Sequence, residues 1–262
     1  MDRLTVEGLH FSYGSKSVLN GVDFTINRGE IVTVLGANGS GKSTLIRCML
    51  GFHFPQKGEI KFDGKNIRSF TQKEMSLRVA YVPQTHKTVF PYSVLDVVLM
   101  GRIPHKNFFF RYSKSDIKIA FDVMDRLSIS HLAERPYTEV SGGERQLTII
   151  ARALAQEADT LILDEPASGL DYGNQIRLLE EIVKLTDSGY TFIKSTHSPE
   201  HDLWIADRVL MIKDGKIFAD GRAVDVITGN NLQHLYNVKI DVAALNGSVK
   251  VCVPSRFLNR KL

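Results

Sequence analysis

The stretch with the clearest chemical potential covers residues 36–44 and reads Gly-Ala-Asn-Gly-Ser-Gly-Lys-Ser-Thr. Four residues separate its first glycine from a later glycine that Lys-Ser follows, which is the spacing of a phosphate-binding loop. Glycines let backbone N–H groups approach an anion closely, and a helix starting at the end of the loop adds the positive end of its dipole. The residues expected to contact a nucleotide here are Gly36, Asn38, Gly39, Ser40, Gly41, Lys42, Ser43 and Thr44.

Two elements must position this loop. Residues 31–35 form an apolar, β-branched run that predicts a buried strand, and the apolar residues between positions 45 and 50 have helical spacing. A plain glycine-rich turn does not account for the five fixed positions and both flanking elements together. We therefore expect Lys42 to reach the β- and γ-phosphates and the Ser43 hydroxyl to bind Mg²⁺.

Two adjacent carboxylates follow a second short apolar strand, predicted over residues 160–163. Asp164, at the carboxyl end of that strand, suits a direct or indirect ligand of Mg²⁺. Glu165 is placed where it could activate a water molecule for attack on the γ-phosphate, as a general base. An Asp-Glu pair is common on protein surfaces, but after a buried strand and on one chain with a phosphate-binding loop it predicts a functional pair.

Residues 140–146, Val-Ser-Gly-Gly-Glu-Arg-Gln, open a helix predicted to run to about Ala155. Ser141 and Glu144 have the spacing of a capping box, so a well-capped helix without a ligand is one interpretation. Gly142 and Gly143 also expose N–H groups to an anion at the helix start. One nucleotide cannot easily use two such helix starts from a single chain, but two chains facing each other could provide them.

Three single residues carry weaker signals. Tyr13, or alternatively Phe11, could stack on adenine, although an aromatic side chain packed on the sheet is an equal interpretation. Gln84 follows a predicted strand and could contact a cation's water shell or a phosphate oxygen, whereas most glutamines are simply exposed. His197 follows a strand expected beside the one that ends in Asp164, so it could contact the γ-phosphate, whereas a lone histidine is more often structural.

The other elements complete the pattern. Helices are predicted over residues 94–100 and 113–127, the latter with an apolar stripe, and after Asp171 with an inward face. The stripe comprises Ile117, Phe121, Met124 and Leu127, and the inward face comprises Ile176, Leu179 and Val183. Further strands are predicted over residues 3–7, 18–26, 59–62, 79–82, 190–195, 208–213 and 216–219. Two weaker strands are predicted at 238–242 and 248–253. Hairpin turns are predicted at Asp63-Gly64 and Asp214-Gly215. The basic, aromatic segment 102–112 either touches a membrane-embedded partner or caps a helical sub-domain.

Bulk properties narrow the class of protein. A length of 262 residues suits one large domain or a core with sub-domains. The content of 43% hydrophobic and 24% charged residues is that of an ordinary soluble protein. A net charge of +4 with scattered basic residues gives little support to nucleic-acid binding. No signal peptide and no membrane-spanning apolar run is apparent. The two cysteines, Cys48 and Cys252, have no metal-like spacing, which fits a reduced cytosolic setting.

Taken together, residues 4–227 resemble the nucleotide-binding subunit of an ABC transporter, with the motifs in that family's order. The resemblance implies that residues 36–44 are the Walker A loop, that Asp164 ends Walker B and that Glu165 is the catalytic base. It implies that Gln84 is the Q-loop residue, binding the metal and assisting catalysis, and that His197 is the switch histidine. It also implies that Tyr13 stacks on adenine. Residues 141–146 would be the signature motif and residues 168–171 the D-loop. The nucleotide-binding residues implied by these two motifs are Ser141, Gly142, Gly143, Glu144 and Asp171. Ala37 and Val140 depart from the usual proline and leucine, and neither contributes a phosphate-binding atom.

This resemblance implies an α/β fold of the P-loop ABC ATPase type, with a RecA-like parallel sheet, an antiparallel β sub-domain and a helical sub-domain. We expect one ATPase domain over residues 1–230, with core and β sub-domain at 1–86 and 156–230, a helical sub-domain at 87–155, and a small C-terminal extension at 231–262. The implied cofactors are ATP and Mg²⁺. The implied partners are a second copy of the chain, two transmembrane permease subunits and, indirectly, an extracytoplasmic solute-binding protein, with no nucleic acid. The implied location is the cytoplasmic face of the cell membrane, as a peripheral subunit.

Residues 90–105, 170–175 and 195–201 are similar to those of importers of metal chelates, namely the iron–siderophore, haem and cobalamin systems with molybdate or tungstate relatives. A second hypothesis is a soluble ABC protein that acts on DNA or ribosomes, but the chain has neither a long coiled-coil insertion nor two cassettes. A third is a P-loop GTPase or kinase, which lacks support because no Asn-Lys-x-Asp base-recognition motif is present and residues 141–146 would be unexplained.

Overall fold

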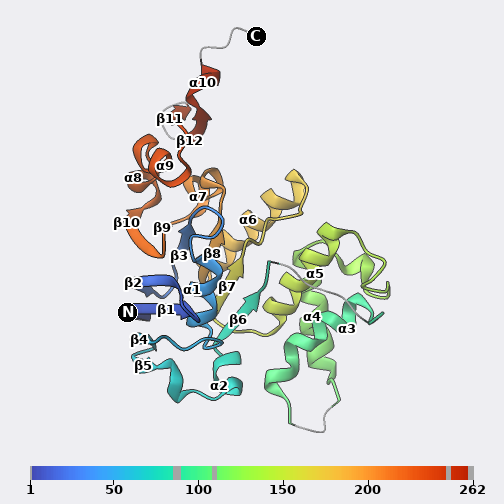
Figure 1. Ribbon diagram of the computed structural model, residues 1–262. Helices are drawn as coiled ribbons and strands as arrows, with labels where there is room; N and C mark the ends of the chain where they lie inside the picture. The colour runs from blue at the N-terminus through green and yellow to red at the C-terminus, as the bar shows by residue number, and fades with distance from the viewer. Residues whose placement is uncertain (1, 85–89, 108–110, 246–248, 259–262) are drawn as a thin grey trace. The chain divides into compact units, whose positions relative to one another are not determined.

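The computed structural model describes residues 2–84, 90–107, 111–245 and 249–258. The chain forms two compact units, labelled by element in Figure 1. Unit 1 comprises Met1–Ser69 and Thr191–Leu262, and unit 2 comprises Phe70–Tyr190. The glycine-rich loop and His197 therefore belong to unit 1, whereas Asp164 and Glu165 belong to unit 2.

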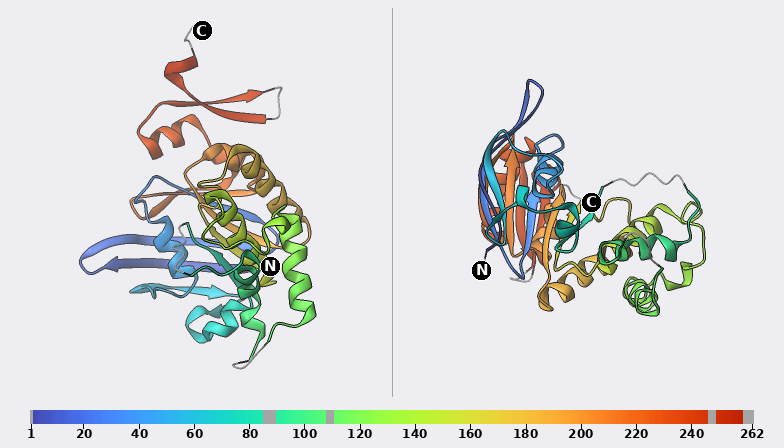
Figure 2. Two further views of the ribbon diagram at one scale, coloured as in Figure 1. Left: turned by 90° about the vertical axis from the view of Figure 1, so that its right-hand side faces the viewer. Right: turned by 90° about the horizontal axis from the view of Figure 1, so that it is seen from below.

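Unit 1 contains an antiparallel sheet with the strand order β2-β1-β4-β5. Its long β1–β2 hairpin, blue in Figure 2, brings Tyr13 opposite Lys16 across the turn. The Asp63-Gly64 turn has φ angles of 49° and 73°, and this left-handed pair is what an Asp-Gly hairpin turn requires. Three predicted strands are confirmed with longer bounds, as β1 (Asp2–Tyr13), β2 (Lys16–Asn27) and β4 (Lys57–Phe62). The short strand β5 (Lys65–Asn66) and η1 (Ile67–Ser69) follow and were not predicted.

Unit 1 also contains parallel strands, with β3 pairing in parallel with both β8 and β9, and β10 antiparallel to β9. Every residue of β3 and β8 is buried, so neither strand alternates between apolar and polar faces, as expected of strands covered on both sides. The carboxyl ends of β3 and β8 lie side by side, since Leu35 is paired with Thr196. The elements are β3 (Ile31–Leu35), α1 (Lys42–Met49), β8 (Thr191–Thr196), α7 (Pro199–Ile205), β9 (Arg208–Lys213) and β10 (Lys216–Arg222).

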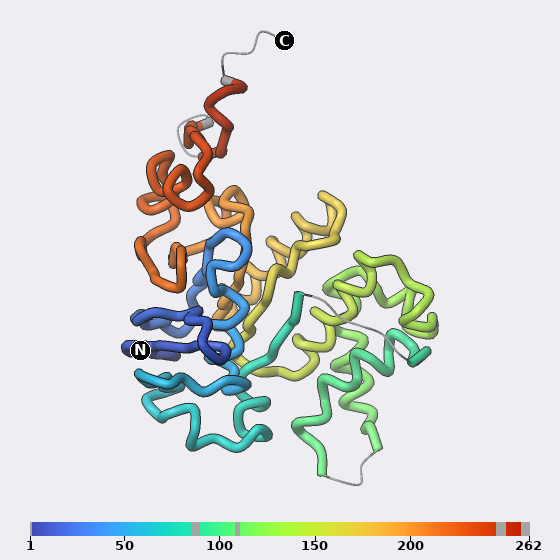
Figure 3. The backbone as a smooth tube through the Cα atoms, in the orientation of Figure 1, coloured from blue at the N-terminus to red at the C-terminus, as the bar shows by residue number. Residues whose placement is uncertain are grey.

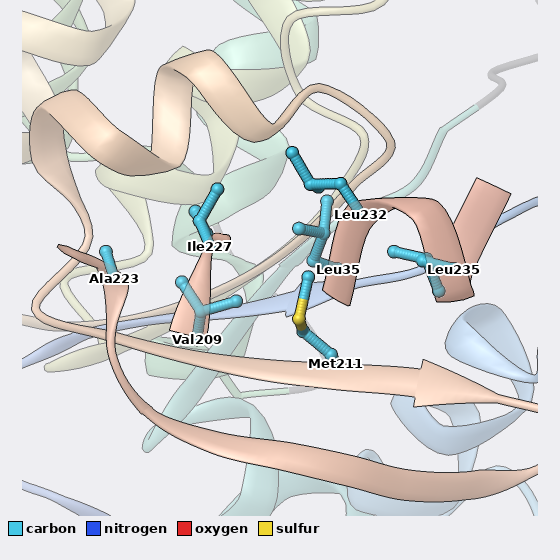
Figure 4. Packing of buried hydrophobic residues seen from close by; sticks show 7 residues of the cluster. All are labelled: Leu35, Val209, Met211, Ala223, Ile227, Leu232 and Leu235. Atoms are coloured by element: carbon cyan, nitrogen blue, oxygen red, sulfur yellow. The ribbon is translucent and has the colours of Figure 1, made fainter. Parts of the chain in front are cut away.

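The end of the chain packs into unit 1. After β10 it follows α8 (Ala223–Val226), α9 (Gly229–Tyr236), β11 (Ile240–Leu245), β12 (Val249–Pro254) and α10 (Ser255–Leu258), orange to red in Figure 3. Two residues of α9, Leu232 and Leu235, join a buried cluster with strand residues Leu35 and Met211 (Figure 4). The two weak strands predicted near the C-terminus are confirmed as an antiparallel hairpin that starts one or two residues later.

Unit 2 combines helices with the parallel pair β6 and β7. Its elements are α2 (Gln72–Ser76), β6 (Val79–Val82), α3 (Val94–Leu99), η2 (Met100–His105), α4 (Lys114–Arg126), η3 (Ser130–Leu132), α5 (Gly142–Ala155), β7 (Thr160–Asp164) and α6 (Tyr172–Asp187). Parallel strands, an antiparallel sheet and a helical region are all present, which confirms the predicted fold class.

The buried face of α4 differs from the predicted stripe. Ile117 is 39% exposed and Phe121 is only half-buried, whereas Asp116 and Ala120 are buried. The prediction counted only apolar residues, but here a carboxylate occupies the inward face. In α6, likewise, Leu179 is buried while Ile176 and Val183 are only half-buried.

Asp116 is buried because two cations neutralise it. The Arg102 Nε atom lies 3.1 Å from one carboxylate oxygen, and the Lys106 ammonium pairs with the other. Arg102 is itself only 6% exposed and also donates to the Ala155 carbonyl oxygen at 2.6 Å. The basic residues at the start of segment 102–112, Arg102 and Lys106, therefore form ion pairs within unit 2. Phe108, Phe109 and Phe110 of this segment lie outside the described residues.

Burial alone raises the pKa of Asp116, but the hydrogen bonds from Lys106 and Ser113 outweigh it and hold this pKa well below the ordinary range. A carboxyl whose pKa is lowered on folding stabilises the fold above its unfolded pKa of about 3.9 and loses that contribution as the pH falls further.

We expect Asp116→Asn to lower the free energy of unfolding by about 3 kcal/mol at pH 7, because it leaves buried cations without their carboxylate. The gap to the wild-type protein should narrow as the pH falls below about 4, since Asp116 is then protonated in the unfolded chain but still ionised in the folded protein. Urea unfolding at several pH values measures both effects. Asp122→Asn, at an exposed position of α4, is the matched control. Equal stability of the two variants at pH 7 would contradict this account.

Candidate functional site

The glycine-rich loop connects the end of β3 to the start of α1. A Cβ atom at Gly36 would lie 2.5 Å from Ser40 Oγ and 2.8 Å from the Ile212 carbonyl oxygen, so only glycine fits there. Gly39 and Gly41 have φ angles of 81° and 110°, in the region that favours glycine. The loop therefore needs its glycines for both close approach and backbone conformation.

Lys42 closes this loop from inside. Its Nζ atom donates to the carbonyl oxygens of Gly36 at 2.8 Å and Ala37 at 3.3 Å, and the residue is 6% exposed. The ammonium group is thus held within the curl of backbone where a phosphate is expected. Ser40 Oγ is buried and has no hydrogen-bond partner among the described residues, so it is a further polar atom for a ligand.

The start of α1 differs from the starts of α2, α3, α4 and α5. In α2, α3, α4 and α5, a serine or threonine side chain caps the helix and forms a capping box. At α1 the N-cap is Gly41, and no side chain of the described residues caps it. A helix start without a cap presents N–H groups and a positive dipole end, which fits an anion such as a nucleotide phosphate.

Tyr13 lies at the end of β1 and is 43% exposed, whereas the alternative Phe11 is only 7% exposed. The Tyr13 ring meets the rings of Phe11 and His53 edge-on, with centroids 4.9 and 5.5 Å away. Arg47, on α1, is within 3.5 Å of the Tyr13 hydroxyl oxygen. The sequence did not predict that His53 and Arg47 contact Tyr13, because only folding brings these residues together.

His197 follows β8 directly and is exposed. The preceding residue, Thr196, accepts a hydrogen bond from the Gly36 N–H at 3.4 Å, so the histidine begins its loop beside the glycine-rich loop. The Thr196 hydroxyl oxygen also accepts a hydrogen bond from Ser198 N at 3.0 Å, across the histidine. Unit 1 thus brings the glycine-rich loop and the His197 backbone to one end of its parallel strands.

In unit 2, Asp164 ends β7 and Glu165 follows it, with exposures of only 4% and 8%. Glu165 has a φ of 50°, an uncommon conformation for a residue with a side chain. Gln84, two residues after β6, donates from Nε2 to Glu165 Oε2 at 2.8 Å. Because β6 and β7 are paired in parallel, their carboxyl ends bring these side chains together.

Ser141 caps α5 as the sequence predicts. Its N–H donates to Glu144 Oε2 at 2.7 Å, and its hydroxyl oxygen accepts from the Glu144 N–H at 3.3 Å. The N–H and hydroxyl of Ser141 lower the pKa of Glu144. Ser141 and Gly142 are exposed at the tip of the helix.

Asp171 is the N-cap residue of α6. Its Oδ1 accepts from the Asn174 N–H at 2.9 Å at the start of α6, and this backbone hydrogen bond lowers the pKa of Asp171. Within unit 2, α5 meets the neighbouring loop, since Gln146 Nε2 donates to the Pro166 carbonyl oxygen at 3.2 Å. The segment between Glu165 and Asp171 is thereby attached to the helix that begins at Ser141.

Other kinds of site find no support. In the described residues, no group of three or more His, Cys, Asp or Glu side chains could hold a metal ion. Burial raises the pKa of the Cys48 thiol to about 12, so this core cysteine is not a nucleophile at neutral pH. Across the residues that the structure describes, every helix is too short or too polar to cross a membrane.

Comparison with known proteins gives consistent results. The sequence profile of the ABC transporter family matches residues 19–168. The molybdate import ATP-binding protein MolC of Haemophilus influenzae is 38% identical, over 90% of this chain and 88% of its own length. The ferric enterobactin transport ATP-binding protein FepC of Escherichia coli is 33% identical, over 90% and 88%. A solved structure described as an inward-facing ABC transporter of the metal-chelate type has 35% identity, covers 97% of both chains and has a TM-score of 0.84.

Proposed function

This chain belongs to the ABC transporter family of ATP-binding, ATP-hydrolysing proteins, and from that premise we propose that it powers uptake of a metal chelate or a related oxyanion across the cytoplasmic membrane. The candidate solutes are an iron–siderophore, haem, cobalamin, and molybdate or tungstate. The names of its relatives, molybdate import and ferric enterobactin transport, support this class of solute. The observation that carries the ATP chemistry is the uncapped start of α1, with the Lys42 ammonium held inside the preceding loop.

Two copies of the chain would form a head-to-tail sandwich around two ATP molecules. Each ATP would lie between the glycine-rich loop of one copy and the Ser141–Gly143 tip of the other. The exposed positions of Ser141 and Gly142 support this arrangement, because an exposed helix N-terminus suits the γ-phosphate of a facing copy. Gly142, Gly143 and Glu144 would complete that tip, and Asp171 would lie at the same seam.

Within the sandwich each residue has a defined task. Lys42 and the backbone N–H groups stabilise charge that develops on the γ-phosphate. Glu165 positions and deprotonates the attacking water, and the hydrogen bond from Gln84 orients its carboxylate. His197 contacts the γ-phosphate, and Tyr13 stacks on adenine with its exposed face.

The residues present also fit Mg²⁺. A hydroxyl, a carboxylate and an amide oxygen are hard oxygen ligands of the kind this ion prefers, and Ser43, Asp164 and Gln84 provide them. When bound, Mg²⁺ would neutralise charge on the β- and γ-phosphates. Mutation of these three residues should therefore raise the Mg²⁺ concentration needed for half-maximal activity.

The second set of partners would be two transmembrane permease subunits, served by an extracytoplasmic solute-binding protein. Opening and closing of the sandwich would pass to them through Gln84 and segment 85–112. Several aromatic and aliphatic side chains of this region are exposed, among them Phe90 at 61% and Ile103 at 48%, which supports a partner surface. The chain would then be peripheral, on the cytoplasmic face of the membrane.

The decisive experiment is to isolate the chain in its complex from membranes and to identify the permease and the solute bound to it. Recovery of a membrane permease with a metal chelate or oxyanion supports the proposal. Recovery of ribosomes or DNA without a permease would favour the alternative, a non-transport ABC ATPase, and would reject import.

We expect Ser141→Ala to lower the ATPase kcat of the purified protein about tenfold, because it removes one hydrogen-bond donor to a charged group. It also removes a helix cap, which costs about 1 kcal/mol of stability. Ser93→Ala removes the equivalent cap of α3 and is the matched control, with a similar loss of stability but unchanged turnover. An unchanged rate for Ser141→Ala, or full activity of a chain that stays monomeric with ATP, would contradict the shared site.

A further inference from the structure

The C-terminal segment, defined here as Gly229–Leu258, is anchored beside the nucleotide loop. Leu232 and Leu235 of α9 are buried against Leu35, the last residue of β3 before Gly36 (Figure 4). The Lys213 ammonium of β9 donates to the His234 carbonyl oxygen at the carboxyl end of α9, where a cation is favourable. These contacts place the end of α9 at a defined position within unit 1.

The last residue of α9 reaches the loop that carries His197. The Tyr236 hydroxyl donates to the His197 carbonyl oxygen at 3.0 Å. Asn237 ends the helix in a left-handed conformation with φ of 57°, so the chain turns away immediately after Tyr236. A hydrogen bond to a carbonyl oxygen restrains the peptide plane and with it the direction in which the His197 side chain leaves the backbone.

A second contact from the C-terminal segment holds the helix that follows His197. The Cys252 N–H of β12 donates to Glu200 Oε1, in the first turn of α7, at 3.3 Å. The other side of α7 is anchored by an ion pair, in which Lys194 Nζ of β8 lies 2.6 Å from Asp202 Oδ1 with both side chains buried. The His197 loop is therefore held between β8, α7 and the C-terminal segment.

We propose that Tyr236 is a positioning residue for His197, and that the C-terminal segment thereby sets the rate of ATP hydrolysis. This inference rests on the proposed function, because it requires His197 to act on the γ-phosphate. Tyr236 acts through the backbone of His197 and touches no substrate. Its hydroxyl should matter for turnover and not for nucleotide affinity, since the glycine-rich loop keeps its own closing contacts from Lys42.

The test is Tyr236→Phe, which keeps the ring and removes only the hydroxyl. We expect kcat to fall about fivefold, which corresponds to the loss of one neutral hydrogen bond, with KM for ATP unchanged and the thermal midpoint lowered by at most about 4 °C. Tyr190→Phe, just before the opposite end of β8, is the matched control with wild-type kcat. Glu200→Ala removes the second contact and should lower kcat in the same direction.

A double-mutant cycle separates positioning from general stabilisation. In a His197→Ala background, Tyr236→Phe should cause no further loss of kcat, because the residue it positions is absent. Full additivity of the two losses, or wild-type kcat for Tyr236→Phe, would overturn the proposal while leaving the proposed function intact. Wild-type kcat for His197→Ala alone would instead reject the assigned role of His197.

Discussion

Glu165→Gln is expected to lower the ATPase kcat by about a thousandfold while ATP still binds, because the amide cannot accept a proton from the attacking water. Glutamine has the size of glutamate and keeps one side-chain oxygen, so it can still accept the hydrogen bond that Gln84 Nε2 donates at 2.8 Å in the wild-type protein. ATP that binds but is not hydrolysed should hold two copies of the chain together. Phosphate release measures the rate, and size-exclusion chromatography with ATP and Mg²⁺ should show a dimer that the wild-type protein forms only transiently.

Glu180→Gln provides the matched control, since Glu180 is an exposed residue of α6 and takes no part in the site. It should hydrolyse ATP at the wild-type rate and show no lasting dimer. Turnover of Glu165→Gln within a few-fold of wild type would remove Glu165 from the role of general base. A slow variant that stays monomeric with ATP would keep the base but reject the sandwich.

Lys42→Ala should weaken ATP binding by at least about thirtyfold, because truncating one partner of a buried charge pair costs about 2–5 kcal/mol. Lys42 has a second task visible in the structure, since its ammonium bridges the carbonyl oxygens of Gly36 and Ala37. Its loss should therefore remove both the proposed phosphate contact and the group that closes the loop. Titration with a fluorescent ATP analogue measures the affinity.

Lys65→Ala, on the exposed strand β5, is the control for loss of one positive charge, and it should bind the analogue as the wild-type protein does. A normal thermal midpoint without nucleotide would show that Lys42→Ala is folded. If this folded variant bound the analogue with wild-type affinity, the glycine-rich loop would not be the phosphate site.

Local patterns explain why much of the site could be predicted. The glycines at positions 36, 39 and 41 have close contacts or positive φ angles that follow from their own short loop. Ser141 and Glu144 form the capping box that their spacing predicts, because both partners lie within one turn of a helix. The hairpin turn at Asp214-Gly215 also forms where the residue types require it, with φ angles of 50° and 73°.

The sequence by itself therefore determined the motifs, the buried strands that carry them and the family of ATP-hydrolysing proteins to which the chain belongs. Each of these depends on residues that are close together along the chain. Only the tertiary structure decided which face of α4 is inward, because the cations that neutralise Asp116 come from a different element. It likewise decided that Tyr236 reaches His197 from 39 residues away. Contacts between distant segments depend on how whole elements pack, and no spacing rule along the chain encodes that.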